Sequence, residues 1–238
     1  MRYFLILLLL YIAYKNKIKR RLCFLLSLIV LFFPLIKTCF YQFTYGQPDG
    51  YNLYQDSFDV KITPISDKKI YPYQKGAFSI LYEKKAKIDL FARVVYVDFN
   101  DTFFSSFDYY SNALYDTISP VDLSVFIGSM ANNWKNYKVN HEKRLMKVSG
   151  NVVFGEWENL HIIPANKNVR AGLNTLKKGD IISLKGFLVD WNPVGSNKKT
   201  KTALSFSTAS EERAGGKFTW LCMQVFVTEL SANGYVFM

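Results

Sequence analysis

The hydrophobic positions of this 238-residue chain change their pattern once. Before about residue 45 they form continuous runs, at 3–14 and 22–36, whereas later they recur in short segments that partly alternate with polar residues. Continuous runs are typical of membrane segments, and alternation is typical of half-buried β-strands. The pattern therefore predicts a membrane anchor over residues 1–45 and one folded domain over residues 46–238.

The second apolar run, "LCFLLSLIVLFFPLI", is the main candidate for a transmembrane helix. It covers residues 22–36, which as a helix span about 22 Å, less than the ~30 Å hydrocarbon core of a bilayer. Extension to Phe43 reaches the required length if Lys37 directs its ammonium group towards the headgroups. We therefore predict a transmembrane helix over residues 22–43. The run at 3–14 is short, so one and two spans both remain open.

The segment between the two apolar runs, "KNKIKRR", determines the predicted orientation. Basic residues beside a membrane span stay in the cytoplasm. A single span and a two-span hairpin both leave the following domain on the opposite side. We therefore expect a protein of the bacterial inner membrane whose C-terminal domain faces the periplasm or exterior. The lipid bilayer is its first expected partner and another envelope protein its second. The absence of an A-x-A cleavage site favours a retained anchor over a signal peptide.

The charge distribution argues against nucleic acid as a partner. Residues 1–40 hold seven Lys and Arg and no Asp or Glu, whereas the rest of the chain holds 23 Lys and Arg and 19 Asp and Glu. Most of the basic excess therefore lies beside the apolar runs, where it sets topology. The small excess on the domain is a weak footprint for binding nucleic acid.

Several segments of the domain are rich in Val, Ile, Phe and Trp and partly alternate, which is typical of antiparallel strands. These predicted strands are residues 58–65, 87–97, 144–154, 180–191, 202–207 and 218–230. Two short helices are predicted between them. The expected fold class is α+β: a mainly antiparallel β-sheet or a partly open barrel with two short helices, preceded by the transmembrane helix.

The first predicted helix begins at "SPVD". Ser119 is a suitable N-cap, Pro120 suits the first helical position, and Asp122 suits the positive end of the helix dipole. The helix is expected to extend to about Asn133. We interpret Asp122 as a helix-start residue in preference to a catalytic carboxylate.

The second predicted helix lies in "PANKNVRAGLNTLKKGD". Asn166 is placed to cap it, and Val169, Leu173 and Leu176 share one face. Gly179 can end it in the left-handed conformation. The unusual residues of this segment therefore have structural uses.

Candidate chemistry is sparse. The chain has no G-x-S-x-G, H-E-x-x-H or phosphate-loop motif, and Cys23, Cys39 and Cys222 are too far apart for a zinc or redox pair. No cofactor and no metal are expected. We interpret Cys222 as a buried unpaired thiol in preference to a disulfide with Cys39.

One weak catalytic candidate remains, in which Cys222 is the nucleophile, His161 the base and Asn166 the group that orients the base. Nothing in the sequence places these residues close together. On a strand, the ring of His161 points away from the side on which Leu160 and Ile162 lie. We interpret His161 as a surface or groove residue with a local hydrogen bond, in preference to a general base.

Three segments also carry a resemblance: "SPVDLSVFIGSM", "HIIPANKNVRAGLNTLKKGDIISLKGFLVDW" and "SFSTASEERAGGKFTWLCMQVFV". Together they resemble an uncharacterised family of small membrane-anchored proteins of Gram-negative bacteria, over residues 118–228. Its features are Ser-Pro-x-Asp-Leu, His-x-Ile-Pro-Ala-Asn, a Gly-Asp strand and a late cysteine, which His161, Asn166 and Cys222 match. "FIGSM" stands where that family has a tryptophan–glycine pattern. The resemblance implies the topology and the fold but no activity.

Three functions follow as hypotheses. The first is an envelope protein whose exported domain binds a partner or acts as a scaffold. The second is an envelope hydrolase or transferase with a Cys–His site. The third is an OB-like barrel that binds an oligomer, suggested by "KKGDIISLKGFLV" and by the basic loop at 196–202.

Overall fold

The structure is a computed structural model of the whole chain. Contacts divide it into two compact units, Met1–Thr44 and Tyr45–Met238. The residues that it describes are 32, 35, 37–48, 57–99, 113–142, 145–196, 199–206, 211–213, 217–219 and 222–238.

The predicted anchor lies mostly outside the described residues. Neither the run at 3–14 nor the basic cluster is described, and residues 37–45 are helical. Among the residues that are described, no helix is both long and apolar enough to cross a membrane. The transmembrane helix at 22–43 stays a prediction.

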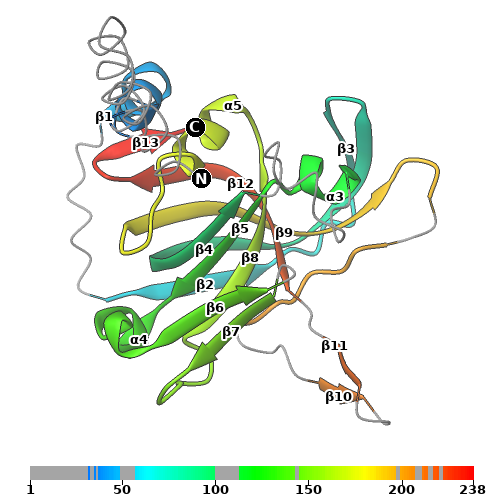
Figure 1. Cartoon of the computed structure of the whole chain (residues 1–238). Coiled ribbons are helices and arrows are strands. Elements are labelled where there is room, and N and C mark those ends of the chain that lie inside the picture. The colour runs from blue at the N-terminus through cyan, green and yellow to red at the C-terminus, as the bar shows by residue number, and fades with distance from the viewer. Residues whose placement is uncertain are drawn as a thin grey trace, which may run out of the picture. The chain divides into compact units, whose positions relative to one another are not determined.

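The second unit consists mainly of β-strands (Figure 1). Its described strands are β1 (Gln47–Pro48), β2 (Asp59–Pro64), β3 (Ile70–Lys75), β4 (Phe78–Phe99), β5 (Val121–Phe126), β6 (Lys138–Glu142), β7 (Leu145–Ser149), β8 (Trp157–Pro164), β9 (Ile181–Pro193), β10 (Glu211–Arg213), β11 (Lys217–Thr219), β12 (Met223–Ala232) and β13 (Tyr235–Phe237). The described helices are α3 (Ala113–Ile118), α4 (Gly128–Asn132), the 3-10 turn η3 (Trp134–Asn136) and α5 (Lys167–Leu173). The predicted α+β class with a mainly antiparallel sheet is confirmed.

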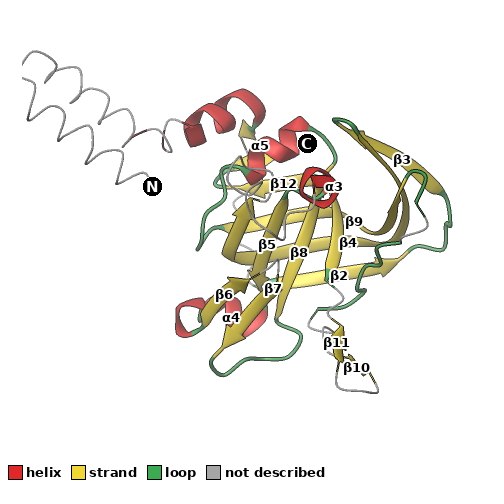
Figure 2. Ribbon diagram, turned by 45° about the vertical axis from the view of Figure 1, so that its right-hand side comes forward, coloured by secondary structure: helices red, strands yellow, loops and turns green. Residues whose placement is uncertain are grey.

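Five of these strands pair in a closed circuit. β4 pairs with β5, β5 with β8, β8 with β12, β12 with β9, and β9 again with β4. The β8–β12 pair is parallel and the other four pairs are antiparallel. Figure 2 shows β5 and β8 side by side on the front of this five-strand circuit. β2 and β3 add to β4, and β13 adds to β12.

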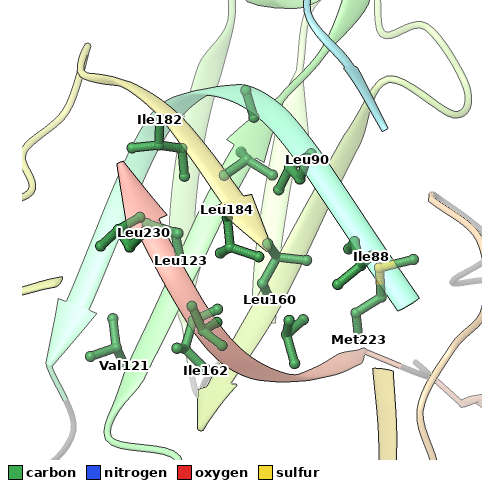
Figure 3. Close-up of a cluster of buried hydrophobic side chains, with 14 of the residues drawn as sticks. Ile88, Leu90, Val121, Leu123, Leu160, Ile162, Ile182, Leu184, Met223 and Leu230 are labelled. Carbon is green, nitrogen blue, oxygen red and sulfur yellow. The ribbon is translucent and has the colours of Figure 1, made fainter. Parts of the chain in front are cut away.

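Inward-facing residues of the circuit form the main core (Figure 3). They alternate along each strand, as Val121, Leu123 and Val125 do on β5. Helix α5 adds apolar side chains to the same core, including Val169 and Leu173. Two smaller apolar clusters are separate from this core, one around Trp191 and one around Phe126.

The first predicted helix is wrong. Residues Val121–Phe126 form strand β5, and within the predicted helix at 119–133 only Gly128–Asn132 are helical. The N-cap signal at Ser119 did not produce a helix, because tertiary contacts stabilise a strand there. β4 and β8 hydrogen-bond to β5 on its two sides, and every second side chain of β5 is buried in the main core. A third short helix, α3, was not predicted.

The second predicted helix is confirmed with a shorter extent. α5 covers Lys167–Leu173, and Asn166 Oδ1 accepts hydrogen bonds from the backbone N–H groups of Asn168 and Val169 at 2.9 and 3.0 Å. Gly179 has φ +98°, but it lies in the turn before β9 and does not end the helix.

Most predicted strands are confirmed with altered ends. Residues 58–65, 87–97 and 180–191 lie on β2, β4 and β9. The segment 144–154 is a strand only to Ser149, and 218–230 contains the end of β11 and most of β12. Residues 201–206 are not a strand. There the backbone N–H of Thr202 donates to the Asp190 carboxylate, so a side chain replaces a strand partner.

Candidate thiol–imidazole–carboxylate site

Strand register places His161 between two polar residues. On β8 it lies opposite Asp122 of β5 on one side and opposite Gln224 of β12 on the other. Directly opposed side chains of neighbouring strands lie on the same face of a sheet. Since Leu160 and Ile162 are buried in the main core, the row of Asp122, His161 and Gln224 lies on the outer face of the circuit. The predicted ring direction of His161 is therefore confirmed.

The ring of His161 is bonded directly to Asp122. Nδ1 lies 2.5 Å from Asp122 Oδ1, so this nitrogen donates its proton to the carboxylate. The Asp122 side chain is completely buried, and the His161 side chain is 12 % exposed. Asp122 is thus the partner of a histidine and not the start of a helix. The local hydrogen bond predicted for His161 is present, but its partner is a charged group.

The surroundings favour the protonated form of His161. Burial alone would lower the pKa of the imidazole, but the charge and hydrogen bond of Asp122, assisted by Cys222, outweigh it and raise the pKa from 6.5 to about 10. An imidazolium next to a buried carboxylate replaces the lost solvation with an ion pair. The ring is therefore doubly protonated at neutral pH.

Cys222 brings a thiol to the same ring. It directly precedes β12, and alternation along the chain places it on the same face as Gln224. It lies close enough to His161 for a side-chain hydrogen bond to contribute to the raised pKa of the imidazole. Because Asp122 occupies Nδ1, Nε2 is the ring nitrogen left to meet the sulfur. Cys222 is a free thiol and partly buried, so the prediction of an unpaired cysteine is confirmed, and Cys39 is also free.

Further hydrogen bonds surround this cluster. The Ser124 hydroxyl donates to Asn159 Oδ1 at 3.0 Å, and Trp191 Nε1 donates to Gln224 Oε1 at 3.2 Å. All four of these side chains are buried. The outer face thus carries a band of bonded polar groups next to apolar residues such as Phe126 and Ile163. Such bonding fixes the orientation of neighbouring side chains.

The structure brings together two of the three predicted site residues. His161 and Cys222 meet, whereas Asn166 caps α5 with its side-chain oxygen. Asp122 takes the orienting position that the sequence had suggested for Asn166. The alternation in "VDLSVF" could have placed Asp122 on a strand, but the register with His161 had no sequence signal.

The described part of the chain offers no metal centre. In it, no three His, Cys, Asp or Glu side chains are arranged to hold a metal ion. Asp122 Oδ1 and His161 Nδ1 are hydrogen-bonded to each other, so these two atoms are directed towards one another.

Comparisons of the chain with protein-family models, with curated proteins and with solved structures found no match.

Proposed function

We propose that this protein is a thiol-dependent acyl hydrolase or acyl transferase, with Cys222 as nucleophile, His161 as acid and base, and Asp122 as the group that orients His161. The observation that carries the proposal is the continuous contact from carboxylate to imidazole to thiol. Nucleophile, base and orienter in this order are the requirement for covalent acyl transfer.

The reaction would proceed in two balanced steps. With its proton held on His161 Nε2, the Cys222 sulfur attacks the acyl carbonyl as a thiolate, the bond to the leaving group breaks, and that proton passes from Nε2 to the leaving group. A thioester results. Water or an acceptor hydroxyl or amine then attacks this thioester, gives its proton to His161, and releases the acyl product and the sulfur of Cys222.

Acylation of the full chain by p-nitrophenyl acetate tests this proposal. We expect one acetyl group on Cys222 by mass spectrometry and a burst of nitrophenolate. Cys222→Ser and His161→Gln should each reduce the burst by at least about 100-fold. Asn166→Ala is the matched control, because Asn166 bonds only within the start of α5, and it should keep the burst. A wild-type rate equal to that of Cys222→Ser would contradict the proposal.

A second candidate is supported by the strand circuit. A meander of β4, β5 and β8 is followed by helix α5 and by two further strands, the last of which is parallel to β8. This order of elements is the one found in OB-like barrels and favours that interpretation. Such barrels bind oligomers through their second and third strands and the adjoining loops; because every residue of β5, the second strand, is buried here, the loops are the candidate binding surface. Retention of the full chain on an anionic polymer column, lost at moderate salt, would support this binding function.

The envelope location is also a proposal. It is supported by the apolar run at 22–43 and the preceding basic cluster. Reporter enzymes that are active only in the periplasm or only in the cytoplasm, fused after Met238, would establish the compartment of the domain. The same fusions after Lys15 would distinguish one span from two. A domain reached only from the cytoplasm would exclude the envelope role and the partners expected with it.

A further inference from the structure

The loop between β7 and β8 exposes three consecutive apolar side chains. Val152 and Val153 are each 38 % exposed and Phe154 is 75 % exposed. We call Val152–Phe154 the apolar tip. Elsewhere in the described residues, large exposed apolar side chains do not occur in such a consecutive group. An exposed apolar tip is unfavourable in water and indicates a surface that binds something.

The tip is held in a defined shape. The backbone N–H of Val152 donates to Gly150 O at 2.9 Å, and that of Glu156 donates to Val153 O at 3.3 Å. Gly150 has φ +129° and lies so close to the Tyr137 ring that an added Cβ would come within 3.2 Å of it. The start of the loop therefore packs against the residues that join η3 to β6. The hairpin of β6 and β7 and helix α4 lie together at one end of the domain (Figure 1).

Basic side chains lie on and beside the segment that packs against the start of this loop. Lys135 and Lys138 flank Tyr137 in sequence and are both exposed. Lys147 is exposed on β7. Lys178 lies with its Nζ 5.7 Å from the Trp134 ring, beside Lys135 at 5.8 Å from the same ring. This part of the domain thus presents several ammonium groups around the Tyr137 and Trp134 rings.

The acidic residue closest to the apolar tip in sequence, Glu156, is directed towards helix α4. The carboxylate of Glu156 accepts hydrogen bonds from the Ser129 hydroxyl at 2.7 Å and from the Met130 backbone N–H at 2.8 Å. It therefore serves the start of α4. In sequence, the β6–β7 hairpin contains a single acid, Glu142, against Lys138, Lys147 and the turn residues Lys143 and Arg144, the last two of which lie outside the described residues.

We propose that the apolar tip and its lysines form a docking site for the surface of an anionic lipid bilayer. Apolar side chains that enter the boundary of headgroups and acyl chains, with a basic rim facing anionic lipids, are the two components of reversible binding to a membrane surface. Phe154 supplies the deepest contact, and Lys135 and Lys138 supply the electrostatic attraction. This docking does not depend on the proposed reaction at Cys222.

The test uses the full chain in lipid nanodiscs that contain phosphatidylglycerol and a phospholipid with a photoreactive diazirine. We expect crosslinks on the peptide that contains Val152–Phe154. Crosslinks on the N-terminal apolar runs serve as an internal reference. Phe154→Ser should reduce crosslinking of the tip at least about tenfold, because the apolar contact is lost. Leu204→Ser, which changes another exposed apolar residue, is the matched control and should leave it unchanged.

The electrostatic part has its own variants. Lys135→Ala and Lys138→Ala should each weaken docking about fivefold, and replacement of phosphatidylglycerol by phosphatidylcholine should weaken it further. Crosslinks confined to the N-terminal runs would overturn the proposal. Crosslinking of the tip that is unchanged both in phosphatidylcholine and in the lysine variants would also overturn the proposal. Capture of the tip by an added envelope protein, with no lipid crosslink, would show that the surface binds protein instead.

Discussion

The protein has two clusters of charged residues that differ in burial, and burial determines how much an ion pair contributes to stability. The buried pair consists of Asp122 and His161, joined by one 2.5 Å contact. The second cluster, which we call the surface network, consists of Glu83, Lys85, Asp190 and Lys199.

The surface network contains more ion pairs than the buried pair, but we expect it to contribute less to stability. Its four ion pairs measure 2.6 to 3.6 Å. A hydrogen bond from Lys85 lowers the pKa of Glu83, and for Lys199 the hydrogen bonds with Asp190 and Glu83 outweigh desolvation and raise the pKa. All of these groups are partly exposed, so water and salt screen their attraction more than that of the buried pair. The number of contacts is thus a poor guide to their strength.

Removal of the carboxylate from the buried pair should have the largest effect. Asp122→Ala leaves the histidine buried without its ion partner, and we expect a loss of about 3–5 kcal/mol in the free energy of unfolding, measured in urea. Asp122→Asn keeps a hydrogen-bonding group and should lose less. If Asp122→Ala were as stable as the wild type, the pair would carry no more weight than the surface network.

The pH dependence of stability should reveal the same pair. Folding raises the pKa of His161, so the stability it contributes is complete below 6.5 and is lost as the pH rises through about 10. We expect the unfolding free energy of the wild type to fall over that interval by at most about 1.4 kcal/mol per pH unit. His161→Gln should remove this part of the slope. Equal slopes in the two proteins would refute the assignment.

A neutral hydrogen-bonding site gives an intermediate reference. Asn166→Ala removes the N-cap of α5, and thermal unfolding should show a loss of about 1 kcal/mol. Alkylation of Cys222 by iodoacetamide should keep its wild-type rate, because Asn166 serves the helix. A slower alkylation rate would indicate that Asn166 influences the reactivity of Cys222.

The surface network should show the smallest effect. Lys199→Ala removes two of its four ion pairs, yet the Lys199 side chain is 44 % exposed. We expect a change of about 0.5 kcal/mol or less in urea unfolding, which decreases further when salt is added. A loss as large as that of Asp122→Ala would contradict the comparison.

Local patterns predicted much of this domain. Alternation of apolar residues identified most of β2, β9 and β12 and half of β4, and a capping signal identified α5. The same reasoning failed at Ser119, where capping and alternation disagree. A strand that has partners on both sides satisfies all its backbone groups and buries one face, which outweighs the approximately 1 kcal/mol of a cap. Competing local signals can be resolved only when the neighbours are known.

By itself, the sequence determined the separation of apolar runs from a β-rich domain, the cap of α5, and the side of β8 from which the His161 ring points, because each depends on neighbouring residues along the chain. Only the tertiary structure decided that Asp122, His161 and Cys222 meet. They are separated by 39 and 61 positions, and their contact depends on strand register and on the parallel pairing of β8 with β12. Register is set by how the whole core packs, and no local spacing encodes it.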